Sequence, residues 1–144
     1  VGVGRTMLAV LTEAYKEEQV EGGEIRTVLK FPAKLAPIKA AIFPLLANKP
    51  ELVEKAKIIF NELKKDFMCE FDDSGNIGKR YRRQDEIGTL ITIVCDFETL
   101  ENNTVTLRDR DTMAQIRVDA TKIKEILGGI IKGEQFLSFG KKIK

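Results

Sequence analysis

The stretch IKAAIFPLL, which runs from Ile38 to Leu46, decides the fold class of this chain. Nearly all of its residues are apolar, so it lacks the alternation expected of a strand with one face in water. A continuous apolar run is typical of a strand covered on both faces, as in a parallel or mixed sheet. Because proline cannot donate to the ladder, Pro44 indicates that the end of this strand bends away from the sheet.

The segments after this strand continue the pattern of strands and helices. Apolar spacing predicts strands over 68–72, 90–97, 104–108 and 114–119, and helices that begin near Pro50, Asn76 and Thr121. Asp73 or Ser74 is the expected cap of the second of these helices, and residues 109–112 are expected to form a hairpin turn. The order predicts an α/β fold with a mixed sheet of about five strands flanked by helices.

The first part of the chain is expected to form a separate unit. An apolar stripe predicts one helix over residues 4–19, and residues 20–37 are expected to form an exposed loop and then an extended connection. The predicted boundary divides the chain into residues 1–34 and 35–144. The basic tail from Gly133 is expected to be loosely held.

The composition favours a globular protein without a metal site. Of the 144 residues, 43% are hydrophobic and 32% are charged, and the net charge of +2 does not by itself indicate nucleic-acid binding. Histidine is absent from the sequence, and the two cysteines, Cys69 and Cys95, lie in apolar runs, so we expect reduced core residues rather than zinc ligands. Apolar runs also stay well short of the ~20 residues that cross a membrane. These features suit a cytoplasmic protein.

The most polar stretch of the predicted α/β unit runs from Asp72 to Gly88 and concentrates positive charge beside Tyr81. Its cations are Lys79, Arg80, Arg82 and Arg83. Cations and exposed N–H groups at a helix start suit phosphate groups, and the ring of Tyr81 suits stacking on an unpaired base. The alternative interpretation is a solvated amphipathic helix whose arginines pair with neighbouring carboxylates.

A second candidate site lies at the expected strand over 104–108. Alternation places Arg108 on the outer face, where a guanidinium group at a strand end can reach a base edge. The simpler interpretation is a charged hairpin turn. The turn also matches Asp-x-Asp-x-Thr, the nucleophile motif of the haloacid dehalogenase phosphotransferases, with Asp109 as the nucleophile. That motif should follow a buried parallel strand early in the chain, so a turn is favoured here.

A third segment, Gly2-Val3-Gly4-Arg5-Thr6, lies near the N-terminus. It lacks the Lys-Ser/Thr ending of a P-loop. Arg5 stands at the start of the predicted helix, where a cation is unfavourable against the helix dipole unless an anion lies nearby. This mismatch indicates a phosphate partner.

Taken together, these segments resemble glycyl-tRNA synthetase of the dimeric class II type. The run GKRYRRQDEIG, from Gly78 to Gly88, is specific to the glycine enzyme among its histidine, proline and threonine relatives. Residues 96–105 and 108–113 are similar to the same family. Residues 2–9 resemble the end of class II motif 3, although Gly4 stands where the family usually has an acidic residue.

The resemblance implies an anticodon-binding domain over residues 35–144, preceded in 1–34 by the end of a catalytic domain. It implies anticodon contacts from Ser74, Lys79, Arg80, Glu98, Arg108 and Arg110. Glu98 and Arg108 match residues that related domains use on the middle anticodon base, so we expect both at one rim of the sheet. An Arg108→Ala change is then expected to reduce the preference for that base.

By the same resemblance, the full enzyme would join glycine to tRNA(Gly) with ATP and magnesium as a homodimer, and Arg5 would contact the ATP phosphates. The chain begins with Val1 rather than Met and is expected to be a fragment. We therefore expect it to bind the anticodon stem-loop without catalysing the reaction, and without a cofactor, metal or membrane of its own. The alternative is an accessory protein that borrowed an anticodon-binding domain.

Overall fold

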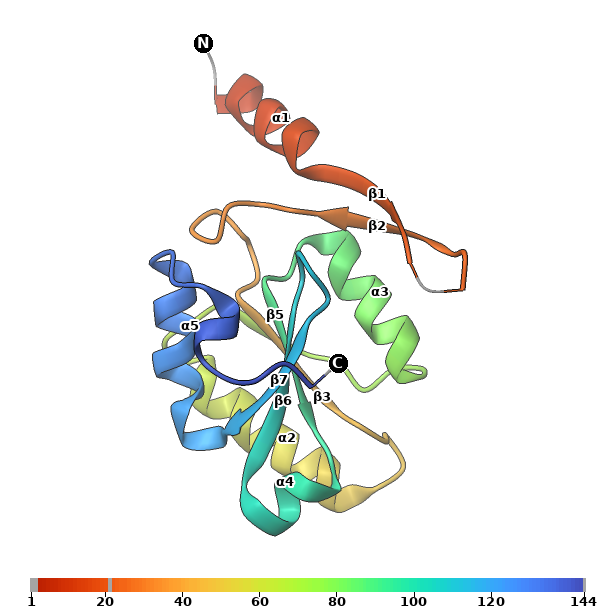
Figure 1. Cartoon of the computed structure of the whole chain (residues 1–144), viewed down its shortest axis with the longest axis vertical. Helices are drawn as coiled ribbons and strands as arrows, with labels where there is room; N and C mark the ends of the chain where they lie inside the picture. The colour runs from red at the N-terminus through yellow and green to blue at the C-terminus, as the bar shows by residue number, and fades with distance from the viewer. Residues whose placement is uncertain (1–2, 21, 144) are drawn as a thin grey trace.

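A five-stranded mixed sheet forms the centre of the computed structural model, which describes residues 3–20 and 22–143 (Figure 1). The strand order is β4-β3-β5-β6-β7. The strands are Ala40–Pro44 (β3), Cys69–Phe71 (β4), Ile91–Cys95 (β5), Thr104–Asp109 (β6) and Gln115–Asp119 (β7). β3 is parallel to β4 and β5, whereas β6 is antiparallel to both of its neighbours. The α/β class and the five-stranded mixed sheet are confirmed.

Helices cover both faces of β3 and β5, which explains their continuous apolar sequences. One face packs against α2 (Pro50–Leu63) and α5 (Ile123–Ile131) in the main core. On the other face, Phe43 and Val94 pack against Ile77 and Tyr81 of α3 (Ile77–Ile87). Figure 1 shows α5 and α3 on opposite sides of the sheet. Burying each large apolar side chain contributes about 1.5–3 kcal/mol, so a strand with two apolar faces is fixed at the centre.

Local signals set both ends of α3. The side chain of Asn76 accepts the N–H of Lys79 at 2.9 Å and caps the helix, so the expected cap at Asp73 or Ser74 is wrong. Gly88 ends the helix at φ 80°, a conformation that favours glycine. A Cβ atom at Gly88 would lie 2.5 Å from ring atoms of Phe31, so the helix end and the segment after β2 approach too closely for any side chain.

A short helix, α4 (Phe97–Asn102), was not predicted and begins where the strand over 90–97 was expected to continue. Asp96 stops β5 because its carboxylate accepts the N–H of Thr99 at 3.1 Å, while the Thr99 hydroxyl accepts the N–H of Asp96 at 2.9 Å. This capping box fixes the turn from β5 into α4. Six residues are too few to show helical periodicity in the sequence.

The N-terminal segment is a helix followed by a hairpin, not the single helix expected over 4–19. The helix α1 spans Val3–Ala14, and the hairpin joins β1 (Tyr15–Gln19) to β2 (Ile25–Leu29) in antiparallel register. The expected loop and connection over 20–37 therefore contain a strand. Arg26 and Val28 of β2 are buried, and Arg26 bonds to Asp85 of α3. In Figure 1 the hairpin lies across the end of α3.

The C-terminal tail is more ordered than the expected loose end. It forms a single 3-10 turn at Phe136–Ser138, and Phe136 and Phe139 pack against the main core. The N–H of Ile143 donates to the carbonyl of Gln115 at 2.8 Å, so the tail extends the edge of β7. Apolar contacts that are distant in sequence therefore outweigh the polar local composition.

The two cysteines lie where the sequence places them. Cys95 is fully buried in the main core, Cys69 is half-buried, and both are free thiols. Burial raises the pKa of Cys95 to about 12 and that of Cys69 to about 11, so neither forms a thiolate readily. Within the described ranges, helices of the length and apolarity that a bilayer requires are absent.

Candidate nucleic-acid interface

The face of the sheet that meets α3 carries the polar residues of β6 and β7. Register pairs Arg108 with Thr92 and with Gln115, and it pairs Thr106 with Val94 and with Arg117. Paired residues share a face, so two arginines, Arg108 and Arg117, lie on this one face. α3 covers the end of the face near Arg108. The end near Arg117, at the start of β6, is the more open part.

At the covered end, the carboxylate of Asp85 accepts hydrogen bonds from several arginine side chains. Arg108 donates to both oxygens of Asp85, at 2.9 and 3.1 Å, and its guanidinium lies 4.7 Å from the ring centre of Tyr81. Arg26 and Arg82 also donate to Asp85, at 3.2 and 3.3 Å. The side chain of Asp85 is only 1% exposed and that of Arg108 only 4%. Burial raises the pKa of Tyr81, and the charge of Arg108 opposes that rise only in part.

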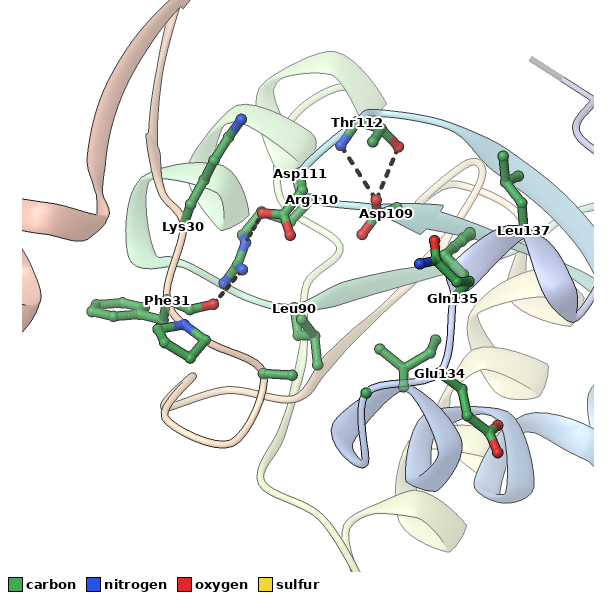
Figure 2. Close-up of a pocket in the computed structure, with 15 residues that line it drawn as sticks. Lys30, Phe31, Leu90, Asp109, Arg110, Asp111, Thr112, Glu134, Gln135 and Leu137 are labelled. Atoms are coloured by element: carbon green, nitrogen blue, oxygen red, sulfur yellow. Dashed lines mark hydrogen bonds and ion pairs between the residues drawn. The ribbon is translucent and has the colours of Figure 1, made fainter.

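Arg110 and Arg80 are buried as well and donate to backbone carbonyls. Arg110 donates to the carbonyls of Gly88, at 3.0 Å, and Phe31, and Figure 2 shows its guanidinium directed at the latter. Arg80 donates to the carbonyls of Pro44 and Leu45 at the end of β3. Desolvation lowers the pKa of Arg80, which is the expected effect of burying a cation.

The resemblance implied anticodon contacts from Arg80, Arg108 and Arg110, but the structure buries all three and bonds their guanidinium groups to protein oxygens, so the expected exposure of Arg108 is wrong. Strand alternation placed Arg108 correctly opposite the inward Val105 and Leu107, but that second face is covered by α3 rather than by water. The sequence did contain a signal that α3 covers Arg108. Tyr81 and Asp85 are four residues apart and therefore share one face of that helix. A carboxylate on the same stripe as an aromatic ring indicates a buried partner for a cation.

At the open end, Arg117 organises a second cluster, which sequence reasoning missed. We define the Arg117 cluster as Asp96, Glu98, Thr104, Thr106 and Arg117. Arg117 bonds to both carboxylate oxygens of Asp96 and donates to the hydroxyls of Thr104 and Thr106 at 3.0 and 3.1 Å. Burial alone would raise the pKa of Asp96, but bonds from Arg117 and Thr99 outweigh it and hold this pKa below its ordinary value.

Glu98 lies at this open end and not beside Arg108. Its Oε2 is 3.3 Å from Nε of Arg117, and its side chain is 59% exposed. Glu98 follows the end of β5, whereas Arg108 is paired with Thr92 near the start of that strand. Asp96 is four positions after Thr92, which corresponds to about 13 Å along a strand. The expected pairing of Glu98 with Arg108 at one rim is wrong, and the guanidinium beside Glu98 is that of Arg117.

A basic groove lies at the start of α3, with a volume of about 620 Å³. We define it by its lining residues, Glu24, Asn76, Gly78, Lys79, Arg82, Arg83 and Glu86. Lys79 is exposed here, and Ser74 is exposed in the turn before the helix. Arg83 donates to both oxygens of Asp72, at 2.8 and 3.0 Å, and to the carbonyl of Ser74 at 2.9 Å. The alternative of arginines paired with carboxylates is thus confirmed for Arg82 and Arg83.

Arg5 is exposed near the start of α1, at the far end of the molecule from the sheet in Figure 1. Gly2, the first residue of its motif, lies outside the described residues. The contacts just described do not bring Arg5 together with the other candidate residues.

The Asp109 turn lines a separate pocket of about 560 Å³ (Figure 2). Oδ2 of Asp109 accepts both the hydroxyl of Thr112, at 2.9 Å, and its N–H, at 3.3 Å. Figure 2 shows this carboxylate directed at Thr112 rather than at the pocket centre. Asp109 ends the antiparallel strand β6, whereas the phosphotransferase motif should follow a parallel one. Its carboxylate therefore stabilises a hairpin turn, which is confirmed at this position.

Comparison with known proteins agrees with this geometry. The family model described as "Anticodon binding domain" matches residues 39–129. The chain is 52% identical over 127 residues to the glycine–tRNA ligase of Clostridium kluyveri, a match that covers 88% of the chain and 27% of the relative. The corresponding enzyme of Clostridium acetobutylicum is 48% identical over 132 residues (92% and 28%), and that of Bacillus cereus strain ZK is 53% identical over 127 residues (88% and 27%). The chain spans about a quarter of the length of these relatives.

Proposed function

The chain belongs to the anticodon-binding-domain family, and from this premise we propose that it reads the anticodon of a glycine tRNA as part of a glycine–tRNA ligase. The observation that carries the proposal is the Glu98 carboxylate, exposed at the open end of the α3 face and held beside Arg117. A sheet face with fixed polar groups can take unstacked bases, as single-stranded RNA recognition requires.

The chemistry of the proposed contact follows from the glycine anticodons, which carry cytosine at the second and third positions. A carboxylate accepts a hydrogen bond from the cytosine amino group, whereas uracil presents a carbonyl oxygen at the same place. Glu98 is therefore assigned to the middle base. Ser74 and Lys79, both exposed at the start of α3, are assigned to the RNA backbone and neighbouring bases.

Arg80, Arg108 and Arg110 enter the proposal as supports and not as direct RNA contacts. Each would have to break buried hydrogen bonds before it met a base or a phosphate. A buried charge that loses its partner is strongly unfavourable. These residues instead fix α3 and the turn after β6, so that the exposed groups are held in place before RNA binds.

The proposal extends to the longer protein only through its relatives. In this proposal the longer protein is a cytoplasmic homodimer that attaches glycine to tRNA(Gly) with ATP and magnesium. Arg5 supports a phosphate contact, because it is exposed at a helix start where its charge opposes the helix dipole. We assign to the chain alone RNA binding without glycine-dependent ATP–pyrophosphate exchange.

Fluorescence anisotropy with the whole chain tests the anticodon assignment. Two labelled glycine anticodon stem-loops are compared, one with cytosine and one with uracil at the middle position. Glu98→Gln is expected to reduce the preference for cytosine by roughly 10-fold, because one good base contact discriminates by about 1–3 kcal/mol. Glu101→Gln, an exposed glutamate on the same helix, is the matched control and should leave the preference unchanged. Equal binding of both stem-loops by the unaltered chain would refute the assignment.

Salt dependence tests the phosphate contact of Lys79. Removing one phosphate contact should lower the slope of log affinity against log salt by about one unit and weaken both stem-loops equally. Lys79→Gln is compared with Lys132→Gln, which alters an exposed lysine at the end of α5 on the other side of the sheet. If the two variants shift the slope alike, Lys79 makes no specific contact.

A further inference from the structure

We propose that Arg117 is the positioning residue that sets base preference at this site, because it holds the Glu98 carboxylate in the orientation that accepts a base amino group. This inference rests on the proposed function and deepens it. It assigns the decisive guanidinium to β7, where neither the sequence nor the family resemblance placed it.

Arg117 is itself immobilised by the groups around it. A guanidinium group has five N–H donors in a rigid plane. One edge is taken by Asp96, and further donors are taken by the hydroxyls of Thr104 and Thr106, at 3.0 and 3.1 Å. Nη1 also lies 3.4 Å from the carbonyl of Thr104. The contacts with Asp96 and with two residues of β6 fix this plane, and Nε lies 3.3 Å from Oε2 of Glu98 in an ion pair.

The fixed guanidinium group of Arg117 in turn restricts Glu98. Glu98 stands on the short helix α4 with 59% of its side chain exposed, and a side chain that exposed is otherwise free to change rotamer. Oε2 is the Glu98 oxygen that lies nearest Arg117, and the two side chains form an ion pair. The carboxylate of Glu98 is thus an acceptor whose orientation Arg117 restricts before RNA binds. Ordering a group in advance removes a cost that would otherwise reduce affinity.

Arg117 acts through Glu98 rather than on RNA directly, because its own donors are already used within the protein. Its side chain is 22% exposed, and its donors are already occupied by protein oxygens. Asp96 also balances the positive charge of Arg117, so the negative charge of Glu98 remains available to attract a base amino group. A uracil at the same place would set its carbonyl oxygen against that carboxylate, and this repulsion contributes to specificity.

A double-mutant cycle on the whole chain tests the inference with the same two stem-loops. Arg117→Gln and Arg117→Lys are each expected to reduce the preference for cytosine by at least about 5-fold, toward the value of Glu98→Gln. Adding Arg117→Gln to Glu98→Gln should change the preference by less than about 2-fold, because both substitutions remove one contact. Urea unfolding of each variant identifies any that do not fold, and Arg117→Lys replaces Arg117→Gln if the latter is unfolded.

The outcomes separate this inference from the proposed function. If Glu98→Gln abolishes the preference while the Arg117 variants keep it, the inference is overturned and the anticodon assignment stands. If the Arg117 variants weaken the binding of both stem-loops by the same factor, the preference for cytosine is unchanged. Arg117 is then only structural, and the inference also fails. If the unaltered chain shows no preference, the anticodon assignment fails first and the inference fails with it.

Discussion

The two ends of the α3 face carry the same pair of residue types and use them differently. At the covered end Arg108 bonds to Asp85, and at the open end Arg117 bonds to Asp96. The first pair is almost completely buried, whereas the second is about one-fifth exposed and adjoins a largely exposed glutamate. This difference indicates that the covering helix, rather than the residue type, determines whether an arginine on this sheet stabilises the fold or orients a binding residue.

Asp85→Asn should produce the largest loss of stability in this comparison. Asparagine leaves the buried cation Arg108 without a carboxylate and leaves Arg26 paired only with Glu18, and breaking a buried ion pair costs about 3–5 kcal/mol. Asp96→Asn at the open end keeps the helix cap, since asparagine caps as well as aspartate, and should cost only about 1 kcal/mol. Urea unfolding of both variants at pH 7 measures the difference. Similar losses at the two sites would show that burial does not distinguish them.

Arg108→Ala is expected to lower stability by about 2–3 kcal/mol, because hydrogen bonds to charged groups contribute roughly 1.5–3 kcal/mol. The loss is smaller than for Asp85→Asn, since Arg26 and Arg82 still donate to Asp85. Folded molecules of this variant should keep the preference for cytosine, which is the reverse of the sequence expectation. Anisotropy below the unfolding transition measures it, and a lost preference would restore Arg108 as a base contact.

The features predicted correctly from sequence are those in which apolar spacing and burial agree. IKAAIFPLL became β3 because both of its faces are covered, and the apolar residues of α2 and α5 form the main core. The strands β6 and β7 were indicated by their alternation, and the turn between them by residues 109–112. In these segments the local pattern and the tertiary contacts favour the same structure.

The errors occur where a distant contact decides the outcome. Residues 15–19 are good helix formers, yet they pair with β2, whose buried Arg26 bonds to Asp85 in a helix 59 residues away. The polar tail is held by apolar contacts with the core. The Arg108 error has the same origin, since alternation shows which face a side chain occupies but not what covers that face. Arg117 was overlooked because the carboxylates beside it lie on a different segment of the chain.

Acid pH should affect the open end through Asp96. Its folded pKa lies below the ordinary value of 3.8, so the carboxylate contributes stability that is fully present above about pH 4 and is lost as pH falls through the folded pKa. The stability difference between the unaltered chain and Asp96→Asn should therefore shrink as pH is lowered from 5 to 2. Urea unfolding at several pH values measures this difference. A stability difference that grows as the pH is lowered would contradict this prediction.

The smallest effect is expected for Arg83→Gln, on the outer surface of the helix that covers Arg108. Arg83 bonds to both oxygens of Asp72 through Nε and Nη2, whereas Arg108 bonds to both oxygens of Asp85 through Nη1 and Nη2, and the side chain of Arg83 is 44% exposed. Exposed ion pairs contribute about 0.2–1 kcal/mol and are screened by salt, so the loss should fall in that range and diminish at 1 M NaCl. Thermal unfolding at low and high salt measures it. Because both arginines bond to two oxygens of one carboxylate and differ mainly in exposure, a loss as large as that of Arg108→Ala would mean that two-oxygen bonding, and not the cover provided by α3, determines the strength of these pairs.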